Sequence, residues 1–277
     1  MSRSGSLMMK QRLVLITGAT AGIGQALVHL AAQKELKLLI TGRNQEELKK
    51  LTDTFGSLIV QAVAADLSQE EGVKTIIDLI HKHCPDIIIN NAGFGLYGEA
   101  LSYSTVQQKH IVDVNVNAVL QLSLEGARAL ISQVKQGVIL NVSSAISFQV
   151  APNMAVYAAT KAFINQFSQS LDEELKPLGI RVLVACPGMV KTEFSQNAGM
   201  TRTRKFTAVM SSKFVARAIW KQIESLTPLT IIDWKYRLLT WLSYLIPKKI
   251  VTAIIKNNIA KRIAPRNVIR LPSCKNK

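Results

Sequence analysis

Short apolar runs alternate with longer segments of helical spacing along most of the chain. The apolar runs are largely apolar on both faces, which is typical of parallel strands covered by helices on both sides. They predict strands at residues 13–16, 38–41, 58–63, 87–90, 138–142, 182–185 and 229–232. The segments between them predict helices at residues 22–34, 44–55, 105–134, 156–176 and 211–225, and another from about residue 69. This alternation predicts one doubly wound α/β sheet of about seven strands in the order 3-2-1-4-5-6-7.

A glycine-rich segment follows the first predicted strand and opens the first predicted helix. It reads Thr17-Gly18-Ala19-Thr20-Ala21-Gly22-Ile23-Gly24. A phosphate at a helix N-terminus meets unpaired N–H groups, and glycines let the backbone approach it closely. An ordinary glycine-rich turn is the alternative, but the place in the first βα unit favours a nucleotide. The residues expected to contact it are Gly18, Thr20, Gly22, Ile23 and Gly24.

The end of the second predicted strand indicates which nucleotide binds. An acidic residue there would bind the ribose 2′-hydroxyl of NAD. The chain instead reads Thr41-Gly42-Arg43-Asn44, without a carboxylate. The guanidinium of Arg43 can pair with a 2′-phosphate. We therefore expect NADP(H) as the cofactor, with NAD(H) and a solvated arginine as the alternative.

Further motifs follow in a fixed order within residues 11–195. They are Asp66-Leu67, Asn90-Asn91-Ala92-Gly93, Asn115, Ser144, Tyr157-x-x-x-Lys161 and Pro187-Gly188. Together with the glycine segment, the series resembles the short-chain dehydrogenase/reductase family, in its shorter form. The resemblance implies a Rossmann-like fold, an NAD(P)-dependent oxidoreductase acting on a carbonyl or alcohol carbon, and a homo-oligomer.

The resemblance also implies a place for each motif residue. The residues implied beside the adenine and its ribose are Asp66, Leu67, Asn91, Ala92 and Gly93. Those implied beside the nicotinamide and its carboxamide are Pro187, Gly188, Val190 and Thr192. Lys161 would hold the nicotinamide ribose, and Asn115 a water that links Lys161 to solvent. Residues 189–206 are expected to form a lid.

A tyrosine four residues before a lysine occurs twice in the chain. Tyr244 and Lys248 repeat the spacing of Tyr157 and Lys161, but Pro247 lies between them and breaks the helical register. Only Tyr157 has a serine thirteen residues upstream, at the end of a predicted strand. We therefore take Tyr157 and Lys161 as the working pair.

The proposed chemistry needs a serine, a tyrosine and a lysine together. A hydride that reaches a carbonyl carbon leaves negative charge on the oxygen, which must then receive a proton. A lysine one turn away shares the tyrosine's helix face, and its charge, together with that of the oxidised nicotinamide, is expected to lower the pKa of Tyr157 from about 10 towards about 7. Ser144 would orient and polarise the substrate oxygen. The rival interpretation is a non-catalytic NADP-binding scaffold or sensor at a membrane surface, which has no need of Tyr157.

The C-terminal part differs in charge and pattern from the rest. Residues 1–200 hold 17 Lys and Arg against 16 Asp and Glu, whereas residues 201–277 hold 17 against 2. Past Trp234, apolar residues at helical spacing are interleaved with aromatic and basic ones, as in a helix lying on an anionic membrane. Packing of this face on the sheet or on a second subunit stays open, and nucleic acid is the least favoured partner. We expect a catalytic NADP-binding domain at 1–232 and a basic helical extension at 233–277.

Composition limits the remaining classes. No apolar run approaches the ~18 residues of a spanning helix, and the first ten residues do not form a signal peptide. Three cysteines without metal or disulfide spacing fit a reducing compartment, and His81-x-His83-Cys84 lacks a second ligand pair, so we expect no metal site. The prediction is a cytoplasmic enzyme, peripheral on a membrane through residues 234–277. The apolar tail favours a hydrophobic, lipid-like ketone or 3-oxoacyl substrate.

Overall fold

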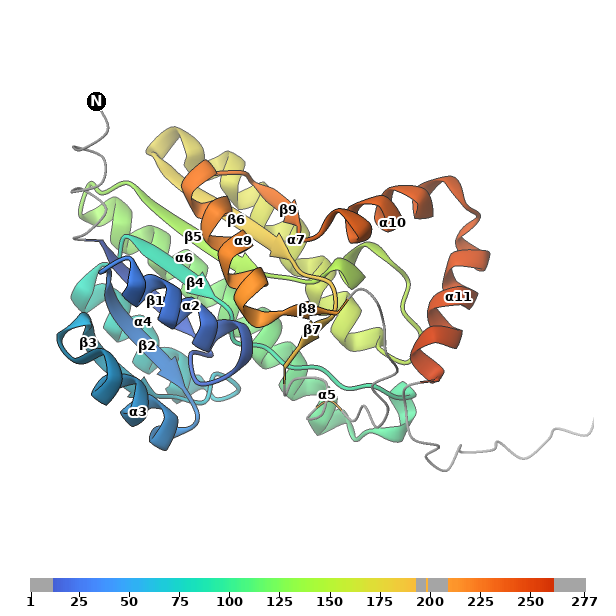
Figure 1. The fold of residues 1–277 in the computed structure, drawn as a ribbon, viewed down its shortest axis with the longest axis horizontal. Coiled ribbons are helices and arrows are strands. Elements are labelled where there is room, and N and C mark those ends of the chain that lie inside the picture. Colours follow the sequence, from blue (N-terminus) through green and yellow to red (C-terminus); the bar gives the residue numbers. More distant parts are fainter. Residues whose placement is uncertain (1–11, 193–197, 199–208, 262–277) are drawn as a thin grey trace, which may run out of the picture.

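A seven-stranded parallel sheet forms the centre of the protein (Figure 1). The computed structural model describes residues 12–192, 198 and 209–261. The strands are β1 (Leu13–Thr17), β2 (Lys37–Gly42), β3 (Ile59–Ala64), β4 (Ile87–Asn90), β5 (Gly137–Val142), β6 (Ile180–Cys186) and β9 (Leu229–Ile231). Their order is β3-β2-β1-β4-β5-β6-β9, so the strand order predicted from the sequence is confirmed. The direction of winding reverses between β1 and β4, where ligands bind in folds of this kind.

Helices cover both faces of the sheet and bury two apolar clusters. One cluster lies under α2 (Gly22–Gln33), α3 (Gln45–Phe55) and α9 (Ser212–Ser225). The other lies under α4 (Glu70–His83), α6 (Val119–Ser132) and α7 (Ala155–Leu175). Strand residues alternate between the two clusters: Leu38 and Ile40 face the first, and Leu39 faces the second. This double burial explains why the strands have no polar face.

The long helix predicted at 105–134 is interrupted in the structure. It consists of α5 (Thr105–Val112), a π-helical segment η3 (Asp113–Ala118) and α6. Such π segments are frequent at functional sites, and this one contains Asn115. Two short strands, β7 (Val190–Lys191) and β8 (Met210–Ser211), form a separate ribbon that the sequence pattern did not predict. Four 3₁₀ turns complete the described elements: η1 (Gly56–Leu58), η2 (Ala100–Ser102), η4 (Ala145–Phe148) and η5 (Lys176–Leu178).

Two helices follow the last strand of the sheet, as the sequence predicted. They are α10 (Trp234–Leu245) and α11 (Lys248–Ala260), and they project from the body of the protein at the right of Figure 1. The side chain of Asp233 begins α10 by accepting a hydrogen bond from Lys235 N at 3.1 Å. Pro247 separates the two helices, so Tyr244 and Lys248 do not share a helix and cannot act as a catalytic pair. Among the helices described, none is long and apolar enough to cross a bilayer.

Candidate active site

The loop between β1 and α2 depends on glycine at three positions. Gly18 and Gly22 have φ values of +63° and +57°, a conformation that side chains disfavour. A Cβ on Gly24 would lie 2.0 Å from the carbonyl oxygen of Gly18, so the loop could not pack against α2. Ala21 precedes α2 and supplies no side-chain cap. Ala21 thus leaves the first N–H groups of α2 without a side-chain cap. Uncapped N–H groups of this kind can bind an anion at a helix N-terminus.

The end of β4 is tied to the end of β1 beside this loop. The hydroxyl of Thr17 accepts hydrogen bonds from the backbone N–H groups of Asn91 and Ala92, each at 3.0 Å. The side-chain amide of Asn91 donates to the carbonyl oxygens of Thr17 at 2.9 Å and Gly18 at 3.2 Å. These bonds tie the Asn91–Ala92 segment after β4 to the end of β1, while the contact of the motif with adenine and ribose stays a prediction.

The carboxyl ends of the strands border a cavity of about 1300 Å³, which we call the central cavity. Arg43 follows the carboxyl end of β2, and its exposed side chain lines this cavity. Asp66 lies on the same wall, and its pKa is lowered: burial raises it, but hydrogen bonds from Ser68 and the charge of Arg43 outweigh that effect. Glu47 also borders the cavity, and its carboxylate is paired with Lys50 at 2.6 Å. The two carboxylates in this part of the cavity wall thus have other partners, Ser68 for Asp66 and Lys50 for Glu47. The positive charge of Arg43 lines the same part of the cavity.

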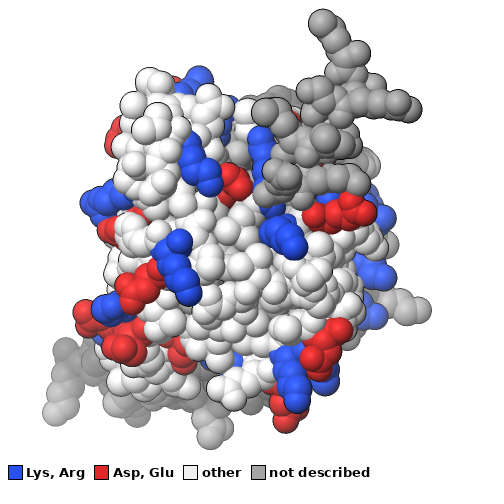
Figure 2. Space-filling model, turned by 90° about the vertical axis from the view of Figure 1, so that its left-hand side faces the viewer, with Lys and Arg blue, Asp and Glu red and all other residues white. Residues whose placement is uncertain are grey.

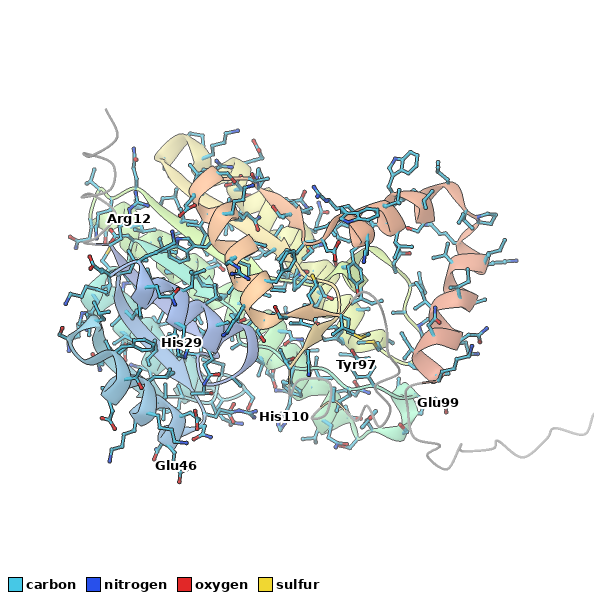
Figure 3. All side chains as sticks on the ribbon, in the orientation of Figure 1. Arg12, His29, Glu46, Tyr97, Glu99 and His110 are labelled. Atoms are coloured by element: carbon cyan, nitrogen blue, oxygen red, sulfur yellow. The ribbon has the colours of Figure 1, made fainter. Side chains whose placement is uncertain are left out.

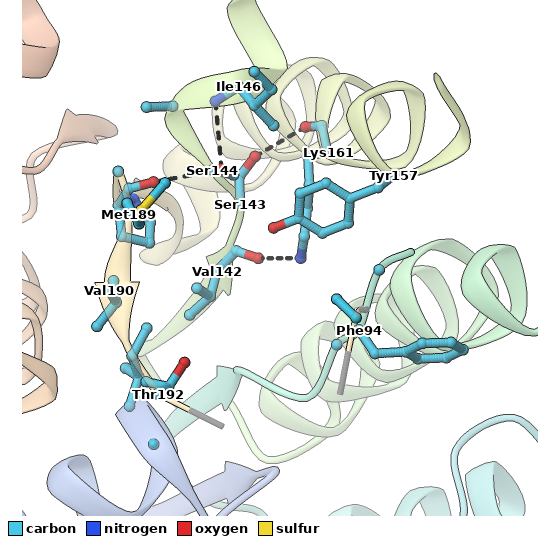
Figure 4. Close-up of a pocket in the computed structure, with 18 of the residues that line it drawn as sticks. Phe94, Val142, Ser143, Ser144, Ile146, Tyr157, Lys161, Met189, Val190 and Thr192 are labelled. Atoms are coloured by element: carbon cyan, nitrogen blue, oxygen red, sulfur yellow. Dashed lines mark hydrogen bonds between the residues drawn. The ribbon is translucent and has the colours of Figure 1, made fainter. Parts of the chain in front are cut away.

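Ser144, Tyr157 and Lys161 come together at the carboxyl end of β5 (Figure 4). Tyr157 and Lys161 lie one turn apart near the start of α7, and both are buried. The Lys161 Nζ lies 5.9 Å from the centre of the Tyr157 ring and donates to the carbonyl oxygen of Val142 at 2.8 Å. The hydroxyl of Ser144 makes a hydrogen bond with the Tyr157 phenol and accepts another from Ile146 N at 3.3 Å. The trio predicted from the sequence thus converges on one cavity.

The protein's own groups raise the pKa of Tyr157 and do not lower it as expected, so that part of the prediction is wrong. Burial raises the pKa of Tyr157 above its ordinary value, the neighbouring Tyr97 adds to the rise, and the hydrogen bond from Ser144 only partly opposes it. Burial also lowers the pKa of Lys161 to about 8. The lysine sends its hydrogen bond to Val142 instead of the phenol. Tyr157 therefore holds its proton at neutral pH, the state from which it can donate.

Asn115 fixes a loop and does not line the cavity. Its side-chain oxygen accepts from Phe94 N at 3.1 Å, and its amide donates to Phe94 O at 2.9 Å and to the Thr160 hydroxyl at 3.1 Å. A Cβ on Gly93 would lie 3.0 Å from the Asn115 side-chain oxygen and 3.3 Å from the Lys161 amine. Asn115 thus holds the Gly93–Phe94 loop against the lysine, and the water that it was expected to hold stays a prediction.

The other predicted residues, apart from Gly24, line the same cavity of about 1300 Å³. Those at the end beside the β1–α2 loop are Gly18, Thr20, Gly22, Ile23, Arg43, Asp66, Leu67, Asn91, Ala92 and Gly93. Those towards the catalytic trio are Pro187, Gly188, Val190 and Thr192. The carbonyl oxygen of Pro187 accepts a hydrogen bond from Ala145 N at 2.8 Å, which places this loop beside Ser144. Of the lid expected at 189–206, residues 193–197 and 199–206 lie outside the described part of the chain.

The outer wall of the cavity was not predicted from the sequence. It is formed by the inward faces of α10 and α11, with Tyr236, Leu239, Thr240, Leu242, Ser243, Ile246, Val251, Ile254, Ile255, Asn258 and Ile259. Helical spacing shows that a helix has an apolar side, but not what that side covers.

Tyr236 joins this wall to the loop that carries Gly188 and Met189. Its hydroxyl accepts a hydrogen bond from Met189 N at 2.9 Å, and a Cβ on Gly188 would lie 2.1 Å from its ring. Further out, Ile255 and Ile259 pack in one apolar cluster with Tyr97 and Tyr157. Figure 3 labels Tyr97 in the part of the body that lies towards α11. The extension is therefore part of the substrate end of the site.

The two histidines considered as metal ligands have other partners. His81 Nε2 lies 3.0 Å from a carboxylate oxygen of Glu125, and His83 Nε2 lies 3.2 Å from the side-chain oxygen of Gln61. In the part of the chain that the structure describes, no group of three or more His, Cys, Asp and Glu side chains could hold a metal ion.

Comparison with known proteins identifies the family. The sequence model of the short chain dehydrogenases matches residues 12–207, which is more than half of the chain. The chain belongs to the short-chain dehydrogenase/reductase family. This short-chain dehydrogenase is 28% identical over 201 residues to an uncharacterized oxidoreductase of Staphylococcus epidermidis, covering 72% of this chain and 86% of the relative. A similar oxidoreductase of Staphylococcus aureus is 30% identical over 183 residues, covering 65% and 79%.

Solved structures of dehydrogenases share the fold. One from Sphingobium yanoikuyae in complex with NADPH has a TM-score of 0.76 at 24% identity, covering 94% of this chain and 100% of the other. A serine dehydrogenase complexed with NADP⁺ has a TM-score of 0.71 at 27% identity, covering 79% and 94%. A 4-hydroxyisoleucine dehydrogenase complexed with NADH has a TM-score of 0.72 at 24% identity, covering 80% and 97%. The protein is thus an NAD(P)-dependent oxidoreductase, and the predicted family, fold class and enzyme class are confirmed.

Proposed function

We propose that the protein transfers a hydride between NADP(H) and the carbonyl or alcohol carbon of a hydrophobic small molecule. One observation carries the proposal: Ser144, Tyr157 and Lys161 meet in a cavity whose outer wall is made largely of apolar side chains from α10 and α11. The family assignment favours this enzyme over the scaffold or sensor that the sequence left open. NADPH consumption with a panel of ketones tests it.

The residues of the cleft fit a dinucleotide. The uncapped N-terminus of α2 suits the pyrophosphate, and Gly18 keeps side-chain atoms away from it. Arg43 supports NADP(H) over NAD(H), since it is exposed at the end of β2 where no carboxylate stands. When bound, the cofactor supplies or accepts the hydride at the substrate carbon.

The catalytic trio would then move one proton at the substrate oxygen. In reduction, Ser144 donates a hydrogen bond to the carbonyl oxygen and holds it against the phenol. Tyr157 gives the oxygen its proton as the carbon gains the hydride, so that C=O becomes CH–OH and the phenol becomes phenolate. Lys161, with a pKa lowered to about 8 by burial, is mostly protonated near neutral pH and stabilises that phenolate through its charge. Oxidation of an alcohol would reverse each of these transfers.

We expect Arg43→Ala to raise KM for NADPH by about 10- to 100-fold and to leave KM for NADH nearly unchanged. The reason is the loss of a charge-assisted pair with the 2′-phosphate, worth about 1.5–3 kcal/mol. Initial rates against both cofactors measure the change. Arg128→Ala is the matched control, since Arg128 is an exposed arginine of α6 outside the cavity. Equal effects on NADPH and NADH would rule out recognition of the phosphate by Arg43.

We expect kcat/KM for unbranched ketones to rise with chain length, by up to about fourfold per methylene until the cavity is filled. Each buried methylene contributes about 0.8 kcal/mol when it leaves water for an apolar wall. A series of ketones that differ only in chain length, assayed through NADPH absorbance, measures this slope. Equal turnover of short polar and long apolar ketones would contradict a hydrophobic substrate.

Three further predictions join the proposal. The boundary between residues 1–232 and the extension at 233–277 is supported by the φ of +75° at Asp233 and by the start of α10 at the next residue. Peripheral attachment of a cytoplasmic protein to an anionic membrane is supported by the basic composition of the extension. Assembly into a homo-oligomer is implied by the family alone.

A further inference from the structure

Helix α10 has two apolar faces, only one of which belongs to the cavity. The inward face lines the cavity with residues such as Leu239 and Leu242. Four other residues, spaced by four, three and four positions, share the opposite side of the helix. These four, which we call the outer stripe, are Trp234, Leu238, Trp241 and Leu245. They are 44–66% exposed, and none of them lines the cavity. A helix that only covered the cavity would have no use for them.

The charge of α10 and α11 is almost entirely of one sign. Residues 234–261 contain six Lys and Arg and no Asp or Glu, the six being Lys235, Arg237, Lys248, Lys249, Lys256 and Lys261. The acidic residue that directly precedes the outer stripe is Asp233, whose carboxylate caps α10. By contrast, acidic and basic side chains mix on the face at the left of Figure 1, which Figure 2 turns to the viewer. A second copy of the chain would bring like charges together at this surface, and leucines have no stacking partner on nucleic acid. Tryptophan and leucine beside lysine and arginine match an anionic lipid surface.

The cavity reaches the surface of the protein at apolar side chains of the same two helices. Its lining runs from Tyr157 past Ile255 to Leu239, Ile246 and Ile254. The last three are 39–57% exposed, so apolar side chains form the rim of the opening as well as its interior. If the cavity opened into water, polar side chains would be favoured at its rim, because apolar side chains that are exposed to water are unfavourable in free energy. An opening that faces lipid has no such constraint.

We propose that the outer stripe of α10 docks on an anionic bilayer, and that the hydrophobic substrate passes from the bilayer between α10 and α11 to Tyr157. The inference rests on the proposed function for its substrate, and adds the docking surface and the route of access. The basic residues bind the headgroups, while the two tryptophans and two leucines enter the interface. The inward faces of the same helices then continue the apolar environment from the lipid to the catalytic trio.

The test uses the full-length protein and vesicles of phosphatidylcholine with or without phosphatidylserine. We expect the wild type to sediment with the vesicles that contain phosphatidylserine, and less so at high salt. The double variant Leu238→Ser/Leu245→Ser should weaken this binding by about tenfold or more, since it removes half of the inserted side chains. Leu178→Ser is the matched control, because Leu178 is 56% exposed and lies in η5, outside the extension. Unchanged sedimentation of the double variant would overturn the docking surface.

Two rate measurements distinguish the proposed route of substrate access from the proposed hydride transfer. On a short, water-soluble ketone without vesicles, the double variant should match the wild type, because the outer stripe does not line the cavity. On a long-chain ketone dissolved in the anionic vesicles, it should be slower by the same factor by which its binding falls. No activity of the wild type on any ketone would refute the proposed function. Full activity on the soluble ketone, with equal rates of wild type and variant on the vesicle-borne one, would refute only the route.

The other occupants of this surface give different results. If a second copy covered the outer stripe, the double variant would change oligomeric state in size-exclusion chromatography and the wild type would not bind vesicles. If nucleic acid were the partner, the wild type would bind single-stranded RNA more tightly than phosphatidylserine vesicles. Either result would overturn the proposal.

Discussion

Tyr157→Phe should lower kcat for ketone reduction by about 10³-fold or more, while NADPH still binds with wild-type affinity. The substitution keeps the ring that packs in the apolar cluster with Tyr97 and Ile259, but removes the proton that the substrate oxygen needs. A positioned general acid contributes about 10²- to 10⁴-fold to a rate, and the Ser144 hydroxyl cannot replace the phenol as a proton donor. Steady-state rates and fluorescence titration with NADPH measure the two effects.

The chain contains a matched control for this variant. Tyr244→Phe alters the other tyrosine that lies four residues before a lysine, but this tyrosine is 69% exposed and does not line the cavity. It should keep wild-type kcat and KM. Full activity of Tyr157→Phe, or equal losses in the two variants, would contradict the role of the Tyr157 phenol.

Lys161→Met should cost about 10²-fold or more in kcat and, at neutral pH, make the protein more stable. Burial lowers the pKa of Lys161 from 10.5 to about 8, so the folded protein binds this proton less tightly than the unfolded chain does. Below pH 8 the lysine is charged in both the folded and the unfolded state, and its burial costs about 3 kcal/mol. The lost hydrogen bond to Val142 offsets about 1 kcal/mol of the gain from methionine. The net expectation is a gain of about 2 kcal/mol and a Tm higher by several degrees.

The stability difference between Lys161→Met and the wild type should depend on pH. Between the folded pKa near 8 and the unfolded pKa of 10.5, the unfolded chain binds more protons at this residue, so the stability of the wild type rises with pH. The advantage of Lys161→Met should therefore shrink across this window and disappear above it. Thermal unfolding of both proteins at about pH 7 and about pH 10 measures the difference. Lys82→Met, on the exposed side of α4, is the control and should show no such trend. A constant difference at all pH values would mean that the charge of Lys161 is not desolvated.

The sequence predicted the sheet because its signals are local. Each strand shows its double burial as an apolar run, for example at Ile87 to Ile89, and the reversal of the strand order follows from βαβ connections. The phosphate loop could be predicted for a similar reason, since the positive φ of Gly18 and Gly22 and the close approach of Gly24 to the Gly18 carbonyl oxygen arise within the segment itself. The catalytic pair needed one further observation, the serine upstream of Tyr157, to distinguish it from Tyr244 and Lys248.

Features that depend on distant partners could not be predicted. The π segment around Asn115 accompanies hydrogen bonds to Phe94, which lies 21 residues earlier. The direction of the Tyr157 pKa depends on burial by the packed cluster, whereas helical spacing shows only that Lys161 is near. The contact of Tyr236 with Gly188 and Met189 joins residues almost fifty positions apart. Because the sequence does not reveal that contact, the aromatic residues of the extension indicated only a position at a membrane boundary.

Isotope transfer tests the central claim most directly. The wild type would be given a long-chain ketone and NADPH carrying deuterium at both C4 positions of its nicotinamide, and the alcohol product would be examined by mass spectrometry. We expect the alcohol to carry one deuterium, bound to the carbinol carbon, and its rate of formation to fall by about 10³-fold or more in Tyr157→Phe. An alcohol without deuterium, or no alcohol from any ketone in the chain-length series, would contradict hydride transfer at this site.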